Sequence, residues 1–466
     1  MNVSDKQVGM HSGSIEMHRQ GTASLSDDAS TVVRQLEIFI VMASLACLNS
    51  SKLEAAVIGI NAPARSLTLE VVEGLPVEER GAWIDYLERS RGQLVRDQNA
   101  LQEEIERANL SEAIIPLGMY STEPISLHNK TLDQLSTPEA LRIANIIVSF
   151  QTPSGGWSKN LDFTERTRLL GEHFAAASES DGVESGSWDK ALVHWRYVGT
   201  YDNHGTIIEL RYLASVAAAA DQVDAAIFRE SVAKGLNYVL SSQLPNGGWP
   251  QVWPLIGGYH DYVTFNDKAM IRVLGFLHDV ARGAPTFEFL SDEQRSLARD
   301  SFRRGLECVI DCQVIADGRR LVWCQQHDMV TLRPGPGRRF EMPALASTES
   351  ASVLLFLMSL GEERSVVAEA VHCGIQWFRE AAIYGRRYAE NEKEGRRLVA
   401  DEAAGPIWAR FYDISGNRPV FGDRDGRIVE SIDQLSGERR NGYRWYSSSP
   451  KQLFQEYEKW LAEGLQ

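Results

Sequence analysis

Hydrophobic residues recur at intervals of three and four positions along much of the chain, a spacing typical of amphipathic helices. The first clear case covers residues 75–108, where apolar side chains stand among many charges. From about residue 137 the periodicity continues. Thr137-Pro138-Glu139 predicts a helix start there, with a capping hydroxyl, a proline at the first position and an acid in the first turn. The pattern therefore predicts a mainly helical protein.

A motif of glutamine, glycine and tryptophan separates the predicted helices. It occurs as Gln151 to Trp157 and as Gln243 to Trp249, and a weaker third copy runs from Gln313 through Asp317-Gly318 to Trp323. Each repeat holds two helices with the turns on one side, so we predict an α/α toroid whose loops gather on one face. The remaining helices are expected at residues 206–220, 226–240, 267–282, 291–313, 348–360 and 363–382.

Three regions follow from this pattern. Residues 1–36 are polar and are expected to be disordered or a leader segment, residues 37–136 to form a helical N-terminal extension, and residues 137–466 to form the toroid. The apolar run at residues 38–48 has the length of a signal-peptide core, but the polar residues before it do not suit the start of a signal peptide. Either the true start is internal or the run is an ordinary helix. No run reaches the roughly 20 apolar residues of a membrane span.

Charge and cysteine content narrow the function. The formal net charge of −15 disfavours nucleic acid, whose phosphates need clustered Lys and Arg. It would also repel an acidic sugar, unless positive charge is concentrated locally or supplied by a metal ion. The chain has five cysteines, an odd and low number that implies no disulfide framework. Cys308 and Cys312, one helical turn apart, lack the further ligands expected of a zinc site.

Two polar clusters directly precede predicted helices. In the first, Thr206 and Glu209 form a capping-box pattern, but Asp202 and Asn203 are not needed for capping and suit a hard cation such as calcium. In the second, Asp267 stands at a helix start, where an N-cap is the simpler interpretation. Both interpretations stay open at each cluster.

Arginines and aromatic residues mark two further segments. Arg338 and Arg339 follow a loop rich in Gly and Pro, and paired arginines in an acidic protein favour an anionic partner. Near the C-terminus, Arg410 lies among aromatic residues and Arg424 lies between Gly422 and Gly426. Aromatic faces stack on sugar rings and guanidinium groups bind carboxylates, although a solvated loop or a packing cluster would use the same residues.

In this order and spacing, the segments resemble the family 10 polysaccharide lyases, which are pectate lyases, over about residues 137–462. The resemblance rests on Phe150-Gln151 to Trp157 with Lys159-Asn160, Tyr201-Asp202-Asn203, Pro245 to Gln251, Thr264 to Asp267, Trp323-Cys324, Gln326-His327-Asp328, Arg338 to Pro343, Trp408 to Tyr412, Asn417-Arg418-Pro419 and Arg439 to Tyr446. Ser158 departs from the family's usual proline. Arg339 departs from its usual small residue, which leaves open which of the two arginines faces the sugar.

The resemblance implies an (α/α)3 toroid that cleaves α-1,4-polygalacturonate by calcium-assisted β-elimination, giving 4,5-unsaturated products. It assigns Ca²⁺ to Asp202, Asn203 and Asp267, and the role of base to Arg338. We expect a monomer, the acidic net charge argues against nucleic-acid partners, and a polymeric substrate favours the periplasm or secretion. By position, the resemblance assigns the binding of substrate carboxylates to Arg410 and Arg424. We predict Arg339, Lys159 and His327 as further substrate-binding residues.

The chemistry explains these residue types. The proton removed lies α to a carboxylate, so the intermediate carries two negative charges, one of which a divalent cation neutralises. Arginine has a pKa above about 12, so acting as a base requires a dry, cation-rich pocket, to which Arg339 or calcium would contribute.

Two alternatives use the same fold. Terpenoid cyclases share the Gln-x-x-x-Gly-x-Trp repeat, but their acid-rich motifs are absent from this chain. A non-catalytic uronate-binding protein would keep the arginines and aromatic residues without needing a base beside a metal.

Overall fold

The computed structural model of the chain describes residues 57–466 apart from 117, 119–124, 128–129, 177–194, 221, 362–364, 392–394 and 464–466. The chain divides into two units, Met1–Ala56 and Val57–Gln466, and the description below concerns the second. The predicted leader segment at 1–36, the apolar run at 38–48 and Cys47 lie outside the described residues.

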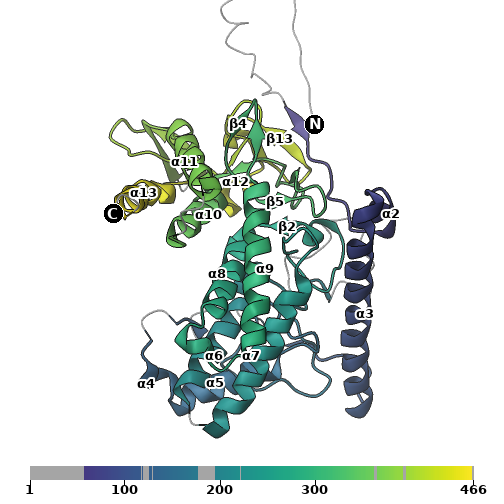
Figure 1. The fold of residues 1–466 in the computed structure, drawn as a ribbon. Helices are drawn as coiled ribbons and strands as arrows, with labels where there is room; N and C mark the ends of the chain where they lie inside the picture. Colours follow the sequence, from purple (N-terminus) through teal and green to yellow (C-terminus); the bar gives the residue numbers. More distant parts are fainter. Residues whose placement is uncertain are drawn as a thin grey trace, which may run out of the picture. The chain divides into compact units, whose positions relative to one another are not determined.

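Helices dominate the second unit (Figure 1), as the hydrophobic pattern predicted. Thr137 caps the first repeat helix as expected, its hydroxyl accepting a hydrogen bond from the backbone N–H of Ala140. The repeat helices are α5 (Pro138–Ser149), α6 (Ile207–Ala219), α7 (Gln222–Ser242), α8 (Ala269–Ala281), α9 (Asp292–Asp311), α10 (Ser347–Ser359) and α11 (Ser365–Glu380). The others are α2 (Leu69–Glu73), α3 (Val77–Arg107), α4 (Leu132–Leu135), α12 (Gly437–Gly442) and α13 (Gln452–Glu463).

Short antiparallel strands pair neighbouring loops through hydrogen bonds, so the described part is helical with small sheets and not purely helical. Two sheets have three strands: β1 (Gly59–Ile60), β13 (Arg427–Val429) and β12 (Phe421–Gly422), and β2 (Val263–Thr264), β5 (Gln326–His327) and β6 (Pro334–Gly335). The pairs are β10 (Trp408–Ala409) with β14 (Tyr446–Ser447), β11 (Phe411–Tyr412) with β7 (Leu345–Ala346), β3 (Ile315–Ala316) with β4 (Arg319–Arg320), and β8 (Arg386–Asn391) with β9 (Gly395–Ala400).

The glutamine of each repeat ties its own loop to the next helix pair. Gln151 Nε2 donates to the carbonyl of Gly155 in its loop and to that of Ser231 on α7, at 2.8 and 2.9 Å. Gln243 makes the same pair of bonds to its loop and to α9, and Gln313 to its loop and to α11. The third copy is therefore a true repeat, and the ties connect α5, α7, α9 and α11 in sequence.

The tryptophan of each repeat donates a hydrogen bond to a backbone carbonyl in the last turn of the helix before it. The indole N–H of Trp157 donates to the carbonyl of Ile147 on α5, and Trp249 and Trp323 make the equivalent bonds to α7 and α9. Trp408 does the same for α11, a fourth copy of this contact that the sequence motif does not mark. The carbonyls at a helix C-terminus have no partner within the helix, so these buried indoles stabilise four helix ends.

Glycine is required in the first two loops. Gly155 and Gly247 have φ angles of 105° and 91°, in the left-handed region that side chains disfavour. A Cβ on Gly155 would lie 2.6 Å from the carbonyl oxygen of Lys234, and one on Gly247 would clash with the carbonyl of Arg304. These loops can thus press against the next helix only because they lack side chains.

The described part of the N-terminal extension packs into the same hydrophobic core as the repeats. Trp83, Tyr86 and Leu87 of α3 are buried in that core, and the Tyr86 hydroxyl donates to the carbonyl of Ser242 at the end of α7. Helix α3 is therefore not a detached arm. Among the helices described, none combines the length and apolar composition required to cross a bilayer.

Candidate functional site

Two single-turn helices bring the predicted calcium ligands together. Asp202 and Asn203 belong to η4 (Asp202–His204), Asp267 belongs to η6 (Asn266–Lys268), and the two turns contact each other. Asn203 and Asp267 both adopt left-handed backbone conformations, with φ of 46° and 49°. Asn and Asp tolerate this conformation better than most residues, and backbone strain of this kind concentrates at functional sites.

Helix capping explains these residues only in part. Helices α6 and α8 do begin directly after the two turns, but neither helix has a side-chain cap hydrogen bond at its N-cap. Thr206 instead bonds to the backbone of Trp157, and only the Glu209 half of the capping box forms, with the backbone N–H of Thr206. The plain capping interpretations of Thr206 and Asp267 are therefore wrong.

Asp202 is the buried anchor of the carboxylate pair. Its oxygens accept hydrogen bonds from Lys159 Nζ at 2.8 Å and from Gln251 Nε2 at 3.0 Å. Burial raises the pKa of Asp202, but the charges of Lys159 and Arg338 outweigh it and hold the pKa below its ordinary value. Asp202 is thus an ionised carboxylate facing at least two cations.

Asp267 is exposed and has the opposite shift. It accepts a hydrogen bond from Asn266 Nδ2 at 2.9 Å. Desolvation by the surrounding protein raises its pKa to about 7, and the negative charges of Asp202 and Glu349 add to the rise. Two carboxylates that repel each other in this way would gain from a shared cation.

Arg338 is held by a glutamate three residues later. Its Nε and Nη2 donate to the two oxygens of Glu341 at 3.0 and 2.6 Å, and the Tyr443 hydroxyl donates to the same carboxylate. Its Nη1 has no hydrogen-bond partner among the described residues, and about 40% of the Arg338 side chain is accessible. The guanidinium is therefore fixed along one edge and free at one nitrogen.

This pairing overturns one expectation. Desolvation lowers the pKa of Arg338, but the charge and hydrogen bonds of Glu341 outweigh it, and the net pKa lies well above the ordinary value. The expectation of a pocket that lowers this pKa is therefore wrong for the described residues, because the sequence does not reveal Glu341 as the partner of Arg338. Glu341 is buried, and Arg338 lowers its pKa.

Arg410 occupies the same region with its own buried acid. It donates to Glu349 at 2.8 Å and lies over the ring of Tyr443, 4.7 Å from the ring centre. Desolvation lowers its pKa, but Glu349 and, more weakly, Tyr443, Glu341 and Asp267 raise it overall. These mutual charge effects place Arg410 within electrostatic reach of Asp267.

A third group of arginines surrounds Phe340. Arg424 lies over this ring at 5.2 Å and pairs with Glu438, and Arg439 lies over it at 4.2 Å and over Tyr443 at 5.0 Å. Desolvation and the charges of Arg424 and Arg338 lower the pKa of Arg439 against the opposing charge of Glu438. The aromatic residues thus hold several guanidinium groups on one wall.

Two predicted substrate ligands lie elsewhere. Arg339 turns away from Arg338 and donates to the carbonyl of Asp425. His327 is completely buried, its Nε2 accepts from the backbone N–H of Cys324, and its Nδ1 faces the carbonyl of Leu332 at 2.8 Å. With both ring nitrogens occupied by backbone groups, His327 offers no nitrogen to a sugar in this conformation.

The residues that support the site were not identified from sequence. Glu341 stood inside a quoted segment and Glu349 at the start of the helix expected at residues 348–360, but an acid is not a residue type expected in an anion-binding wall. Arg439 likewise stood inside a quoted segment, and its approach to Phe340 is visible only in the fold. Gln251 ended the quoted segment Pro245 to Gln251, two residues after Trp249, a position that could have suggested contact with the site.

The donors around η4 and η6 fit a calcium ion that is only partly enclosed by protein. In the described ranges no three His, Cys, Asp or Glu side chains gather as a metal cluster. Asp202, Asp267 and Asn203 nevertheless supply carboxylate and amide oxygens, the hard ligands that calcium prefers. Because calcium takes about six to eight oxygens, the rest would come from substrate and water.

Glu209 provides a test of the electrostatics beneath the site. Burial raises the pKa of Glu209 to about 8. Between about pH 4.5 and 8 its carboxyl is therefore ionised in the unfolded chain and protonated in the folded protein. Stability is therefore lost as pH rises through this window. The unfolding free energy of Glu209→Gln minus that of the wild type, measured with denaturant, should be larger at pH 8 than at pH 5. The increase should be on the order of a few kcal/mol.

The exposed Glu293 at the start of α9 offers the control, since Glu293→Gln should give the same difference from wild type at both pH values. An equal effect of Glu209→Gln at pH 5 and pH 8 would mean that Glu209 is ionised in the folded protein.

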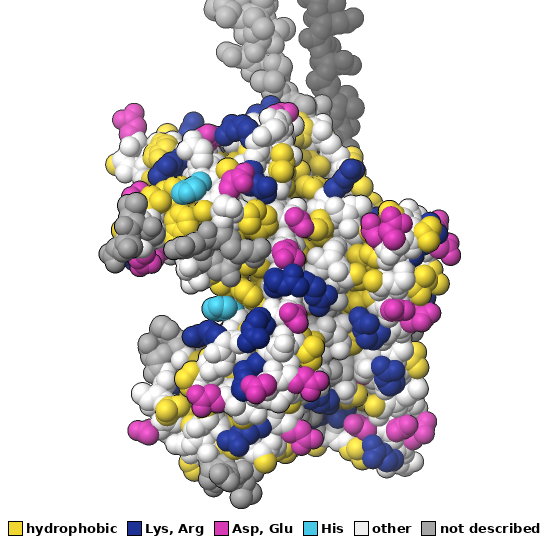
Figure 2. All heavy atoms as spheres, in the orientation of Figure 1, with side chains coloured by type: hydrophobic (Ala, Val, Ile, Leu, Met, Phe, Trp, Pro, Cys, Tyr) yellow, Lys and Arg dark blue, Asp and Glu magenta, His cyan; other side chains and the backbone are white. Residues whose placement is uncertain are grey.

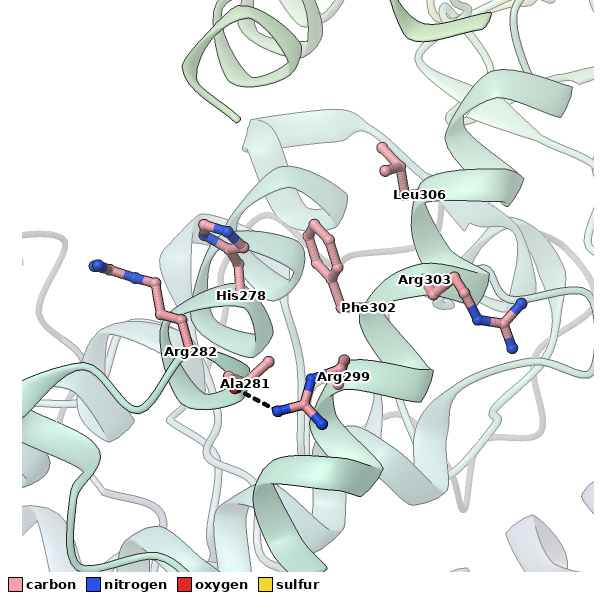
Figure 3. Close-up of a pocket in the computed structure, with 7 residues that line it drawn as sticks. All are labelled: His278, Ala281, Arg282, Arg299, Phe302, Arg303 and Leu306. Carbon is pink, nitrogen blue, oxygen red and sulfur yellow. Dashed lines mark hydrogen bonds between the residues drawn. The ribbon is translucent and has the colours of Figure 1, made fainter. Parts of the chain in front are cut away.

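A separate cavity of about 480 Å³ lies between α8 and α9, and it contains none of the predicted site residues. Lys and Arg side chains gather over α9 among acidic ones (Figure 2). In the cavity His278 and Phe302 face each other, but the guanidinium groups of Arg282 and Arg303 point apart, and Arg299 bonds to the carbonyl of Ala281 (Figure 3). Because its cations diverge, this cavity does not form a convergent anion site.

Comparisons with known proteins identify a family and solved structures that this chain resembles. A family model described as pectic acid lyase matches residues 151–454. A family 10 polysaccharide lyase from Cellvibrio cellulosa is 30% identical, covers 73% of this chain and 98% of its own, and superposes with a TM-score of 0.59. A structure of an aspartate-to-alanine mutant of a family 10 polysaccharide lyase from Cellvibrio cellulosa, in complex with trigalacturonic acid, is 29% identical. It covers 73% of this chain and 99% of its own, with the same TM-score. The comparison with curated proteins gave no match.

Proposed function

The chain belongs to the pectic acid lyase family, and from this membership we propose that it cleaves polygalacturonate by β-elimination, with Arg338 as the base and calcium as the cofactor. Family membership makes the protein a polysaccharide lyase. The proposal adds the substrate, the roles of the individual residues and the products. A structural relative in complex with trigalacturonic acid supports a galacturonate substrate for this chain as well.

One observation carries the proposal. The carboxylate of Asp202 is influenced by the charge of Arg338, and that of Asp267 by the charge of Arg410. The loops at 202, 267, 338 and 410 therefore share one electrostatic environment, although they are far apart in sequence. A carboxylate pair suited to a cation, facing a wall of arginines, is what the elimination of a uronate requires.

The reaction removes the proton at C5 of a galacturonate unit and expels the oxygen at C4. The proton passes to the base, and the electron pair of the C–H bond forms the C4–C5 double bond. The C4–O bond breaks with its electrons leaving on oxygen, which takes a proton from water, and the base then returns its proton to solvent. Arg410 and Lys159 would bind substrate carboxylates, and Arg424 would add a further contact. We leave Arg339 and His327 out of this set because their side chains are engaged elsewhere.

Nη1 of Arg338 is the nitrogen we assign to proton transfer. Glu341 holds Nε and Nη2, so loss of a proton from Nη1 would leave both of these hydrogen bonds intact. The raised pKa keeps the resting guanidinium protonated, and the neutral fraction grows about tenfold with each unit of pH. The base role therefore implies faster turnover at alkaline pH.

Asp202, Asp267 and Asn203 would hold the calcium ion, which supplies a positive charge beside the uronate carboxylate and so stabilises the extra negative charge of the intermediate. Lys159 already neutralises Asp202 in part, and Gln251 fixes the orientation of its carboxylate.

We further propose that the helix pairs close into the (α/α)3 toroid and that the enzyme acts outside the cytoplasm, where its polymer occurs. The order of the glutamine ties, from α5 through α7 and α9 to α11, supports the first part.

Incubation with polygalacturonate and calcium tests the proposed function. We expect unsaturated, ultraviolet-absorbing oligogalacturonides to accumulate. Release of only saturated sugars would indicate hydrolysis, and binding without any product would indicate a non-catalytic uronate-binding protein.

A further inference from the structure

The segment at residues 57–67 lies outside the range matched by the family model, yet it runs along the candidate site. Its strand β1 extends the sheet of β13 and β12, with Gly59 opposite Ile428 and Ile60 opposite Arg427. The backbone N–H of Asn61 then donates to the carbonyl of Gly426 at 2.7 Å. The segment is therefore fixed to the loop that carries Arg424.

Asn61 turns its side chain onto the loop of the proposed base. Its Nδ2 donates to the carbonyl of Arg338 at 3.2 Å and to that of Arg339 at 3.0 Å. Two carbonyl oxygens can be satisfied only by the NH₂ end of the amide, which fixes the orientation of the group. The residue is 3% exposed, and its Oδ1 has no partner in the part of the chain that the structure describes.

The same segment contacts two further loops near the site. Arg65 forms a two-pronged ion pair with Asp328, at 2.7 and 2.9 Å. The backbone N–H of Leu67 donates to Asp261, and the Ser66 hydroxyl accepts from the backbone of Gly258. These contacts fix the path of the segment and make its hold on the Arg338 loop part of a continuous attachment.

We propose that Asn61 is a positioning residue that sets the backbone of Arg338 for proton abstraction, an inference that rests on the proposed function. Glu341 orients the guanidinium and binds the backbone N–H of Arg338, and its own N–H donates to the Arg338 carbonyl at 2.7 Å. The carbonyl of Arg339 has Asn61 as its side-chain donor. Without Asn61 this peptide would turn toward water, and a displacement of about 1 Å at a reacting group can cost roughly a hundredfold in rate.

The experiment compares Asn61→Ala and Asn61→Leu with Thr68→Ala. Leucine keeps about the size of asparagine but cannot donate to a carbonyl, whereas Thr68 caps α2 in the same extension without touching the Arg338 loop. At pH 8, kcat on polygalacturonate should fall at least about tenfold in both Asn61 variants while KM stays within about twofold, because the base is displaced and not the arginines that bind carboxylates. Thr68→Ala should keep the wild-type kcat.

Amide hydrogen exchange of the peptide spanning residues 336–342 provides a readout that needs no activity. Exchange should accelerate in both Asn61 variants and not in Thr68→Ala. Unchanged exchange, a fall in kcat in Asn61→Ala alone, or accelerated exchange with wild-type kcat would each overturn the positioning role. A wild-type protein that forms no unsaturated product would refute the proposed function instead, and the exchange data would still decide whether Asn61 holds the loop.

Discussion

Arg338→Lys is expected to lower kcat on polygalacturonate by about a thousandfold, within the range of roughly 10² to 10⁴ that a general base contributes. Lysine keeps the positive charge beside Glu341, so the buried acid is not left alone and the fold should survive. It has one nitrogen in place of three, however, and a nitrogen bound to Glu341 cannot also face the C5 proton. The measurement is the initial rate of unsaturated product at several pH values.

Arg339 is the natural control because it is adjacent in sequence and turned toward Asp425. Arg339→Ala should stay within about threefold of the wild-type rate, as most substitutions remote from a site do. If Arg338→Lys retained wild-type turnover, or if Arg339→Ala lost it, the proton would not pass to Arg338. The first outcome would leave Arg338 as a binding group only, and the second would move the base to its neighbour.

Asp267→Asn is expected to abolish calcium-dependent turnover at calcium concentrations that saturate the wild-type enzyme, with a loss of at least about a hundredfold. The substitution removes a charged ligand and keeps a residue type that accepts the left-handed backbone found at this position. A chelator should reduce the wild-type enzyme to the same level, and added calcium should restore it. Product formation and calorimetric calcium titration in the presence of oligogalacturonate measure the two effects.

Asp317→Asn is the matched control. Asp317 is also an exposed aspartate with a left-handed backbone, φ 50°, but it lies in the turn between β3 and β4. The variant should therefore bind calcium and turn over substrate like the wild type. Wild-type activity of Asp267→Asn, or activity that survives complete chelation, would contradict the proposed cation site.

The helices and their order could be predicted from the sequence because local signals specify them. The hydrophobic period, the cap at Thr137 and the repeated Gln and Trp residues all have physical counterparts in the structure. The proximity of Asp202 and Asp267 was implied by resemblance and not by spacing, since nothing local relates two turns 65 positions apart in the chain. The short sheets were missed because most have strands of two residues, too brief to show a period.

The partners of the charged residues could not be predicted in the same way. Arg338 and Arg410 stand out in the sequence as cations suited to an acidic sugar, whereas the buried Glu341 and Glu349 that orient them do not. The fold decides which partner a loop arginine has, because its neighbours in sequence are the same whether its side chain faces solvent or a buried carboxylate. His327 illustrates the reverse case, a residue chosen by motif whose ring serves the backbone.

The glutamine ties have a consequence for how such a protein can change. Each glutamine bonds one carbonyl of its own loop and one carbonyl of the neighbouring helix. The spacing of consecutive loops is therefore set by the helices and not by the length of the segments between them. Segments between the ties can therefore lengthen or diverge, as in the third repeat, which carries the hairpin of β3 and β4, while the loops keep their spacing. The connecting segments can therefore vary and change specificity, whereas loss of one glutamine would remove the hydrogen bonds that join its loop to the next helix.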